Sequence, residues 1–188
     1  FLYVIPMNPD AMTPEITRQL LAMTSLKVHQ VLRIFSVYVA NLKFIADPWP
    51  VIDELLDASL YIINNGGTIG LIRILYHLLK KSEMFRQQNE ERCLQIFAQA
   101  LYTIDFDDAA CAFSAICGVG SSHIELPREI IVFHLKYPDI RPFVISYLAN
   151  RGSVPFDKGI IEGILSAAKT NEVAAMLLCK VAELPEGA

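Results

Sequence analysis

The stretch from Asn64 to Lys81 constrains the fold of this chain more strongly than any other. When residues 69–81 are placed on a helical wheel at about 100° per residue, the polar and small residues gather in one wedge roughly 100° wide. This wedge contains Gly70, Arg73, His77, Lys80 and Lys81, and the other positions are apolar. A surface helix needs an apolar stripe of only about that width. The pattern therefore predicts a helix that is buried on most sides and exposes one narrow basic stripe.

The residues before this helix predict that one helix ends and the next begins within a few positions. Two asparagines and two glycines occupy positions 64–67. Gly66 is predicted just beyond the end of the preceding helix, where φ is positive and glycine is unstrained. Thr68 is predicted to cap the next helix by accepting a hydrogen bond from an early backbone N–H.

The rest of the chain also follows helical patterns. β-branched residues in the span 26–45 leave a strand as an alternative there, but its apolar face persists over many turns. Ser82–Gln88 is predicted to be a short polar link or one turn of helix. Asn89 and Asn171 are predicted to cap helices, and helix capping is expected among the carboxylates of Asp105, Asp107 and Asp108. Helices joined by short turns must bury their apolar faces on one another, so an all-α stack is expected. The expected helices span residues 14–23, 26–45, 50–64, 69–81, 89–103, 109–117, 127–136, 140–150, 157–169 and 171–184.

A weak internal repeat supports this stack. The segment Tyr61–Gly66 matches Tyr147–Gly152 in the spacing of tyrosine, asparagine and glycine. The two tyrosines are 86 positions apart, and half of that interval, about 43, falls in the roughly 40–47-residue period of armadillo and HEAT repeats. A middle copy at 102–107 keeps the tyrosine, has aspartate for asparagine and lacks the glycine.

The run Ile63–Leu75 resembles the turn between the second and third helices of an armadillo repeat. In this run the end of one predicted helix is followed by Asn-Asn-Gly-Gly and then by the start of a helix rich in isoleucine and leucine. The resemblance implies a single domain over 1–188, folded as a right-handed superhelix of stacked helices of armadillo or HEAT type. Third helices in such a superhelix line a concave groove that binds extended peptides or partner domains. The approximate repeats would be 14–45, 50–81, 82–117 and 126–169, with a partial one at 171–184.

Carried over to this chain, the resemblance places the basic stripe of Arg73, His77, Lys80 and Lys81 in the groove. The corresponding wedge of the last full repeat carries Lys158, Glu162, Ser166 and Lys169. Cationic side chains at i, i+4 spacing suit an acidic or phosphorylated segment of a protein partner. The alternative is an ordinary solvated helix face.

Two further residues are singled out by their surroundings. Trp49 lies between Pro48 and Pro50, and it is predicted either to anchor a partner or to plug the first layer of helices. Gly163 falls toward the apolar side of its helix, where it predicts the close approach of a neighbouring helix despite its low helix propensity.

Composition excludes several function classes. The net charge is −4, so the chain lacks the overall positive field that nucleic-acid binding requires. No apolar run reaches the ~18 residues of a membrane span, and no cysteine or histidine spacing suggests a metal. Residues Asn64–Gly70 lack the phosphate-binding loop pattern, so no cofactor is expected. Four cysteines among apolar neighbours suggest buried thiols in a reducing, cytoplasmic compartment.

The leading hypothesis is a non-catalytic scaffold or regulatory domain, cut from a larger signalling protein such as a kinase. It would bind a partner peptide or domain along the groove. A helical regulator of a small GTPase, acting through an edge or convex surface, is the main alternative. An enzyme with a thiol nucleophile is a third hypothesis, and it requires an exposed cysteine of low pKa. The partner and the oligomeric state stay open.

Overall fold

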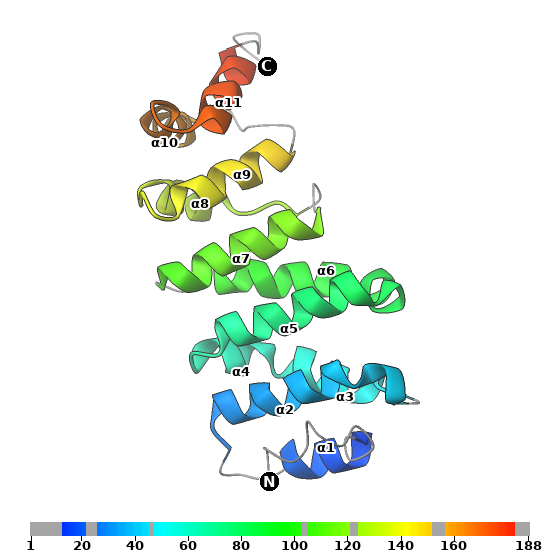
Figure 1. The fold of residues 1–188 in the computed structure, drawn as a ribbon. Coiled ribbons are helices and arrows are strands. Elements are labelled where there is room, and N and C mark those ends of the chain that lie inside the picture. The colour runs from blue at the N-terminus through cyan, green and yellow to red at the C-terminus, as the bar shows by residue number, and fades with distance from the viewer. Residues whose placement is uncertain are drawn as a thin grey trace. The chain divides into compact units, whose positions relative to one another are not determined.

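The computed structural model describes residues 13–21, 26–45, 47–102, 105–120, 124–151 and 157–182, and within them the chain is helical with no strand (Figure 1). The all-α prediction is therefore confirmed. Residues 1–12 and the ends of the predicted helices at 23, 103 and 184 lie outside the described residues, as do parts of the repeat windows 102–107 and 147–152. Contacts divide the chain into two compact units, Phe1–Ile96 and Phe97–Ala188. The prediction of one domain of repeats over 1–188 stays a prediction.

The first unit is built from six helices and a short 3₁₀ turn in its described part. They are α1 (Pro14–Leu21), α2 (Val28–Ala40), η3 (Leu42–Phe44), α3 (Trp49–Asp57), α4 (Ser59–Asn64), α5 (Thr68–Lys81) and α6 (Glu83–Ala100), inside which the division of units falls. α2 packs on α1 and on α5, and α4 packs on α3 and α5 (Figure 1).

Several predicted helix boundaries in this unit were wrong. Residues 82–88 are not a link, because α6 is continuous from Glu83 and Asn89 lies inside it. Ser82 accepts the hydrogen bond from Phe85 N–H at 3.2 Å that marks the helix start. The expected helix 50–64 is interrupted at Ala58, between α3 and α4.

The central helix α5 follows the predicted burial pattern. Arg73, His77, Lys80 and Lys81 are exposed, and the apolar positions are buried or half-buried. Gly66 has φ +77°, as expected for the residue after a helix end. Thr68 does not cap the helix, because Gly67 takes the cap position and the buried Thr68 hydroxyl has no hydrogen-bond partner among the described residues.

Helices α2 and α5 run parallel to each other. At their starts, a Cβ added to Gly67 would touch Val28, and one added to Gly70 would touch Leu32. At their ends, residues 39–40 of α2 and 77–81 of α5 line one cavity. Gly67 follows Val28 by 39 positions in the sequence, and Gly70 follows Leu32 by 38. The two helices therefore stay adjacent over their whole length, and glycines let their starts approach closely.

The second unit contains α7 (Phe106–Val119), α8 (Arg128–Leu135), α9 (Arg141–Arg151), α10 (Lys158–Ala168) and α11 (Glu172–Ala182). α9 packs against the other four helices, and α10 packs against α8 and α11 (Figure 1). The Asp105 carboxylate caps α7, accepting from Asp107 N–H at 2.9 Å and Asp108 N–H at 3.2 Å. The side chain of Asn171 caps α11 through Ala174 N–H at 3.1 Å. Both predicted caps are confirmed.

Gly163 allows α10 to approach α8 closely. A Cβ at this position would lie 2.8 Å from Leu135 Cβ, which the α8 backbone holds in place. The predicted close approach is therefore confirmed. Tyr147 of α9 holds the segment before α8 through two hydrogen bonds. Its hydroxyl donates to the Ile124 carbonyl at 2.8 Å and accepts from Leu126 N–H at 3.1 Å.

His134 on α8 is a buried polar side chain of this unit, 1% exposed. Its Nε2 lies 3.0 Å from the Leu101 carbonyl oxygen, which can only accept, so Nε2 carries the hydrogen. Phe113 and Phe133 contact the ring edge to face at centroid distances of 5.5 and 5.0 Å. The buried Nδ1 has no hydrogen-bond partner in the described part of the chain. A second proton on this ring would therefore be placed in apolar surroundings.

We expect His134 to make the protein less stable in mild acid. Burial lowers the pKa of His134, and the Leu101 hydrogen bond opposes this only in part. The unfolded state therefore binds the proton more readily. The resulting stability is fully present above the ordinary histidine pKa of about 6.5 and is lost as the pH falls below it.

The free energy of unfolding in urea, measured at about pH 7.5 and about pH 5.5, tests this expectation. The difference between the two values should shrink in His134→Gln, which keeps a donor for the Leu101 carbonyl. The exposed-histidine variant His77→Gln should leave the difference as it is. If the His134→Gln variant showed the same difference in unfolding free energy between the two pH values as the unchanged protein, His134 would not be the cause of the instability in acid.

Candidate functional site

A basic face runs along the parallel pair of α2 and α5. On α2 the exposed positions are His29, Arg33, Ser36 and Ala40, which follow one side of the helix. On α5 the exposed positions are those of the predicted basic stripe, Arg73, His77, Lys80 and Lys81. Neither helix contains an acidic residue, and neither does η3, which carries Lys43. This exposed surface of α2, η3 and α5, which we call the basic face, therefore has one sign of charge.

Three acidic side chains of the first unit pair with arginines of other helices. Arg18 of α1 binds Glu54 of α3 at 2.7 Å. Arg92 of α6 forms an ion pair with Asp57 and a longer contact of 4.0 Å with Asp53. By contrast, Arg73, His77 and Lys81 have no hydrogen bond or ion pair within the described ranges. Their donors are therefore available to an anionic ligand.

One end of the basic face opens into a cavity of about 410 Å³, which we call the Trp49 cavity. His77 and Lys81 of α5 line it together with Trp49 and with Lys43 of η3. The apolar part of the lining comes from Val39, Leu42 and Pro48, among others. The structure thus brings three of the predicted binding residues, Trp49, His77 and Lys81, to one place. An apolar side chain with a neighbouring acid matches this lining.

Trp49 is held in position by the core and also reaches the surface. The buried Tyr38 of α2 donates its hydroxyl hydrogen to the Pro48 carbonyl at 3.1 Å, directly before Trp49. Burial raises the pKa of Tyr38 to about 12, so this hydroxyl stays a donor. The indole stacks on buried Phe85, with centroids 6.2 Å apart and planes at 14°. Trp49 is half-buried. It therefore combines features of the predicted anchor and of the predicted plug.

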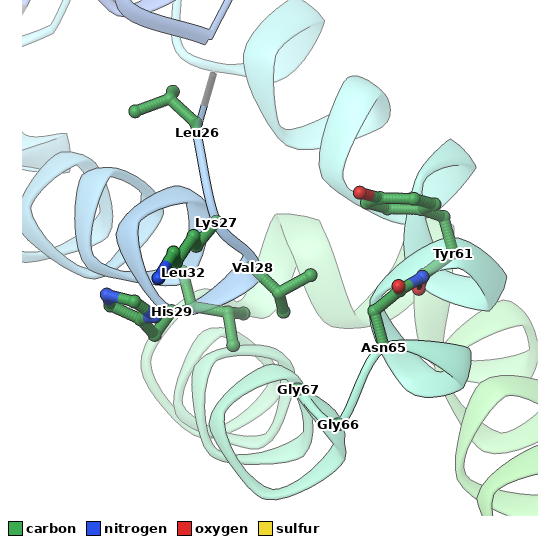
Figure 2. Close-up of a pocket in the computed structure, with 9 residues that line it drawn as sticks. All are labelled: Leu26, Lys27, Val28, His29, Leu32, Tyr61, Asn65, Gly66 and Gly67. Carbon is green, nitrogen blue, oxygen red and sulfur yellow. Dashed lines mark hydrogen bonds between the residues drawn. The ribbon is translucent and has the colours of Figure 1, made fainter. Parts of the chain in front are cut away.

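The other end of the pair has a second cavity, of about 510 Å³, which we call the Tyr61 cavity. Figure 2 shows the Tyr61 ring projecting from α4 toward Leu26 and Val28, with Asn65 beside it. Gly66 and Gly67 form the floor, and a Cβ at Gly66 would meet nothing within 4 Å. Lys27 and His29 lie beyond Val28, at the edge next to the basic face (Figure 2).

The predicted residues of the second unit form a different surface. Lys158, Glu162 and Lys169 are exposed on α10 and its end. Lys158 Nζ lies 3.9 Å from the Glu162 carboxylate in an i, i+4 pair. This wedge is mixed in sign, and one of its two lysines already has a carboxylate partner. It therefore attracts an anion less strongly than the basic face does.

The cysteines differ from the prediction of four buried thiols. Cys93 is buried and Cys111 and Cys117 are half-buried, but Cys179 is exposed because it lies on the outer side of α11. None of the four forms a disulfide. Burial raises the pKa of Cys93 to about 12 and also raises that of Cys117. These two thiols are poor nucleophiles at neutral pH.

In the described part of the chain, no cluster of histidine, cysteine, aspartate and glutamate is arranged to hold a metal ion. None of the helices there combines the length and apolarity needed to cross a membrane. Comparisons of the chain with protein-family models, with curated proteins and with solved structures gave no significant match.

The Tyr61 cavity and the α2 half of the basic face were missed by the sequence patterns. The exposed residues of α2 recur at helical spacing, so the missing acidic residues over positions 26–45 were a usable signal. The sequence did not show that α2 lies parallel to α5. Because the two helices are adjacent, their exposed stripes form one surface.

Proposed function

We propose that the chain is a non-catalytic interaction domain whose first unit binds an acidic or phosphorylated segment of a protein partner. The observation that carries this proposal is the meeting of His77 and Lys81 with Trp49 around one cavity, at the end of a face without acidic residues. Cations that surround an apolar floor bind carboxylate or phosphate groups beside an apolar side chain. A scaffold or regulatory role in a larger signalling protein is consistent with such binding.

We further propose that the helices stack as an armadillo- or HEAT-type superhelix. The parallel packing of α2 and α5, with facing residues 38 and 39 positions apart, supports this arrangement. Equivalent helices of successive repeats are related in this way, because each repeat contacts mainly its neighbours. The interval lies close to the lower end of the roughly 40–47-residue period of these repeats.

Fluorescence anisotropy with a labelled glutamate-rich peptide, and with its phosphoserine counterpart, tests the proposed binding. The double variant Arg73→Glu/Lys81→Glu should bind about tenfold more weakly or worse, a loss of about 1.4 kcal/mol. The affinity of the unchanged protein should also fall as salt is added, because the contacts are exposed. A circular dichroism melt first establishes that the variant folds like the parent.

The matched control is Lys158→Glu/Lys169→Glu, which changes the net charge by the same amount on the α10 wedge. It should weaken binding much less. Equal losses in the two double variants would mean that overall charge drives binding, and no loss in Arg73→Glu/Lys81→Glu would favour a regulator that uses another surface. A single-stranded oligonucleotide that binds more tightly than both peptides would overturn the proposal of a protein partner.

A further inference from the structure

Each cavity includes a residue from the exposed face of α2. His29 belongs to the exposed face of α2 and lines the Tyr61 cavity. Ala40 belongs to the same face and lines the Trp49 cavity. A ligand that follows the exposed face of α2 therefore meets one lining residue of each cavity.

The separation of the cavities follows from helix geometry. His29 and Ala40 are about 16 Å apart along α2 at a rise of about 1.5 Å per residue, and Gly67 and Lys81 are about 21 Å apart along α5. An extended peptide advances about 3.3 Å per residue. About five or six residues of extended chain are therefore enough to connect the cavities.

Each cavity offers an aromatic wall beside cations. The Tyr61 side chain is 59% exposed, and the Val28 side chain faces it across the space (Figure 2). Lys27 and His29 stand at its edge, as Lys81 and His77 do at the Trp49 cavity. Between the ends lie further cations of α2 and α5 and no acidic residue of either helix. Partly exposed aromatic side chains of this kind are frequent anchors of binding interfaces.

We infer that the partner segment is an extended acidic peptide held at both ends, with one apolar side chain in the Trp49 cavity and a second, about five or six residues away, against Tyr61. This inference rests on the proposed function and specifies the length and pattern of the segment. The acidic residues between the anchors lie over the basic face. The segment runs along the axes of α2 and α5.

Two labelled peptides of identical composition test the spacing. In one, leucines at the two ends are separated by about five glutamates, and in the other both leucines stand together at one end. Only the first can fill both cavities while its acids follow the basic face. We expect the intact protein to bind the spaced peptide about tenfold more tightly than the reordered one. Anisotropy titrations at one low salt concentration measure both affinities.

Tyr61→Ala should remove most of this preference, and Lys81→Glu should weaken the binding of both peptides. Tyr102→Ala is the matched control, because Tyr102 is a tyrosine of the second unit with nearly the same exposure, 58%. It should leave both affinities unchanged. Melting curves should agree among the tyrosine variants, since both side chains are largely in solvent.

The outcomes separate the two proposals. If Lys81→Glu weakens binding but spacing and Tyr61 have no effect, the two-anchor inference is wrong and the proposed function stands. If neither peptide binds the intact protein, or if Lys81→Glu has no effect on either, both fail. Loss of the spacing preference in Tyr61→Ala alone among the tyrosine variants supports the inference.

Discussion

Replacing Phe113 by alanine is expected to lower the free energy of unfolding of the second unit by about 3–5 kcal/mol. Phe113 is fully buried in α7, where it contacts His134 edge to face and lies 6.1 Å from the Tyr147 ring. Truncation removes the apolar surface of the ring and leaves a cavity between α7 and its neighbours. Urea unfolding followed by circular dichroism measures the loss.

Two variants decide whether packing explains this effect. Phe113→Leu retains much of the side-chain volume, so its cost should be roughly 1.5 kcal/mol or less. Phe106→Ala removes a ring of the same helix that is 38% exposed and contacts the Tyr137 ring at an interplanar angle of 46°, and it should cost only roughly 1 kcal/mol. A Phe113→Leu variant as unstable as Phe113→Ala would show that the cavity is not the cause.

Replacing Gly67 by alanine is expected to destabilise the first unit by about 1–3 kcal/mol through overpacking. The new Cβ would lie 2.5 Å from both Val28 Cγ1 and Ile62 Cγ2. Both atoms are on branched side chains that have few alternative rotamers, so α2 and α5 must move apart. Because Gly67 has φ −99°, no left-handed strain contributes to the cost.

A double-mutant cycle identifies the clash. Val28 is half-buried, and its truncation to alanine removes one of the two close atoms. The Gly67→Ala/Val28→Ala protein should therefore be more stable than the sum of the single effects predicts. Strict additivity would place the cost of Gly67→Ala elsewhere. The same displacement of α2 from α5 would disturb the Tyr61 cavity, which Gly67 and Val28 both line.

Local patterns in the sequence were sufficient to predict the helices and several of their ends. The wheel of residues 69–81 identified the exposed stripe of α5, because burial on a helix follows the period of 3.6 residues. The caps at Asp105 and Asn171 and the positive φ of Gly66 depend only on neighbouring backbone groups, so they could be predicted from a few residues. The wrong cap at Thr68 and the missed continuity of α6 show where this reasoning ends. The start of α6 at Ser82 was itself a local signal, because the Ser82 hydroxyl accepts from Phe85 N–H.

The arrangement of the candidate site depended on contacts that no local pattern contains. Trp49 begins α3, whereas His77 and Lys81 lie on α5, and only the packing of the helices makes Trp49 their neighbour around one cavity. Tyr61 and His29 meet at the other cavity for the same reason. Sequence periodicity determines which face of each helix is exposed, because exposure is a property of one helix. Which exposed faces lie side by side is decided by the close approach of α2 and α5 at Gly67 and Gly70, which is a property of the pair.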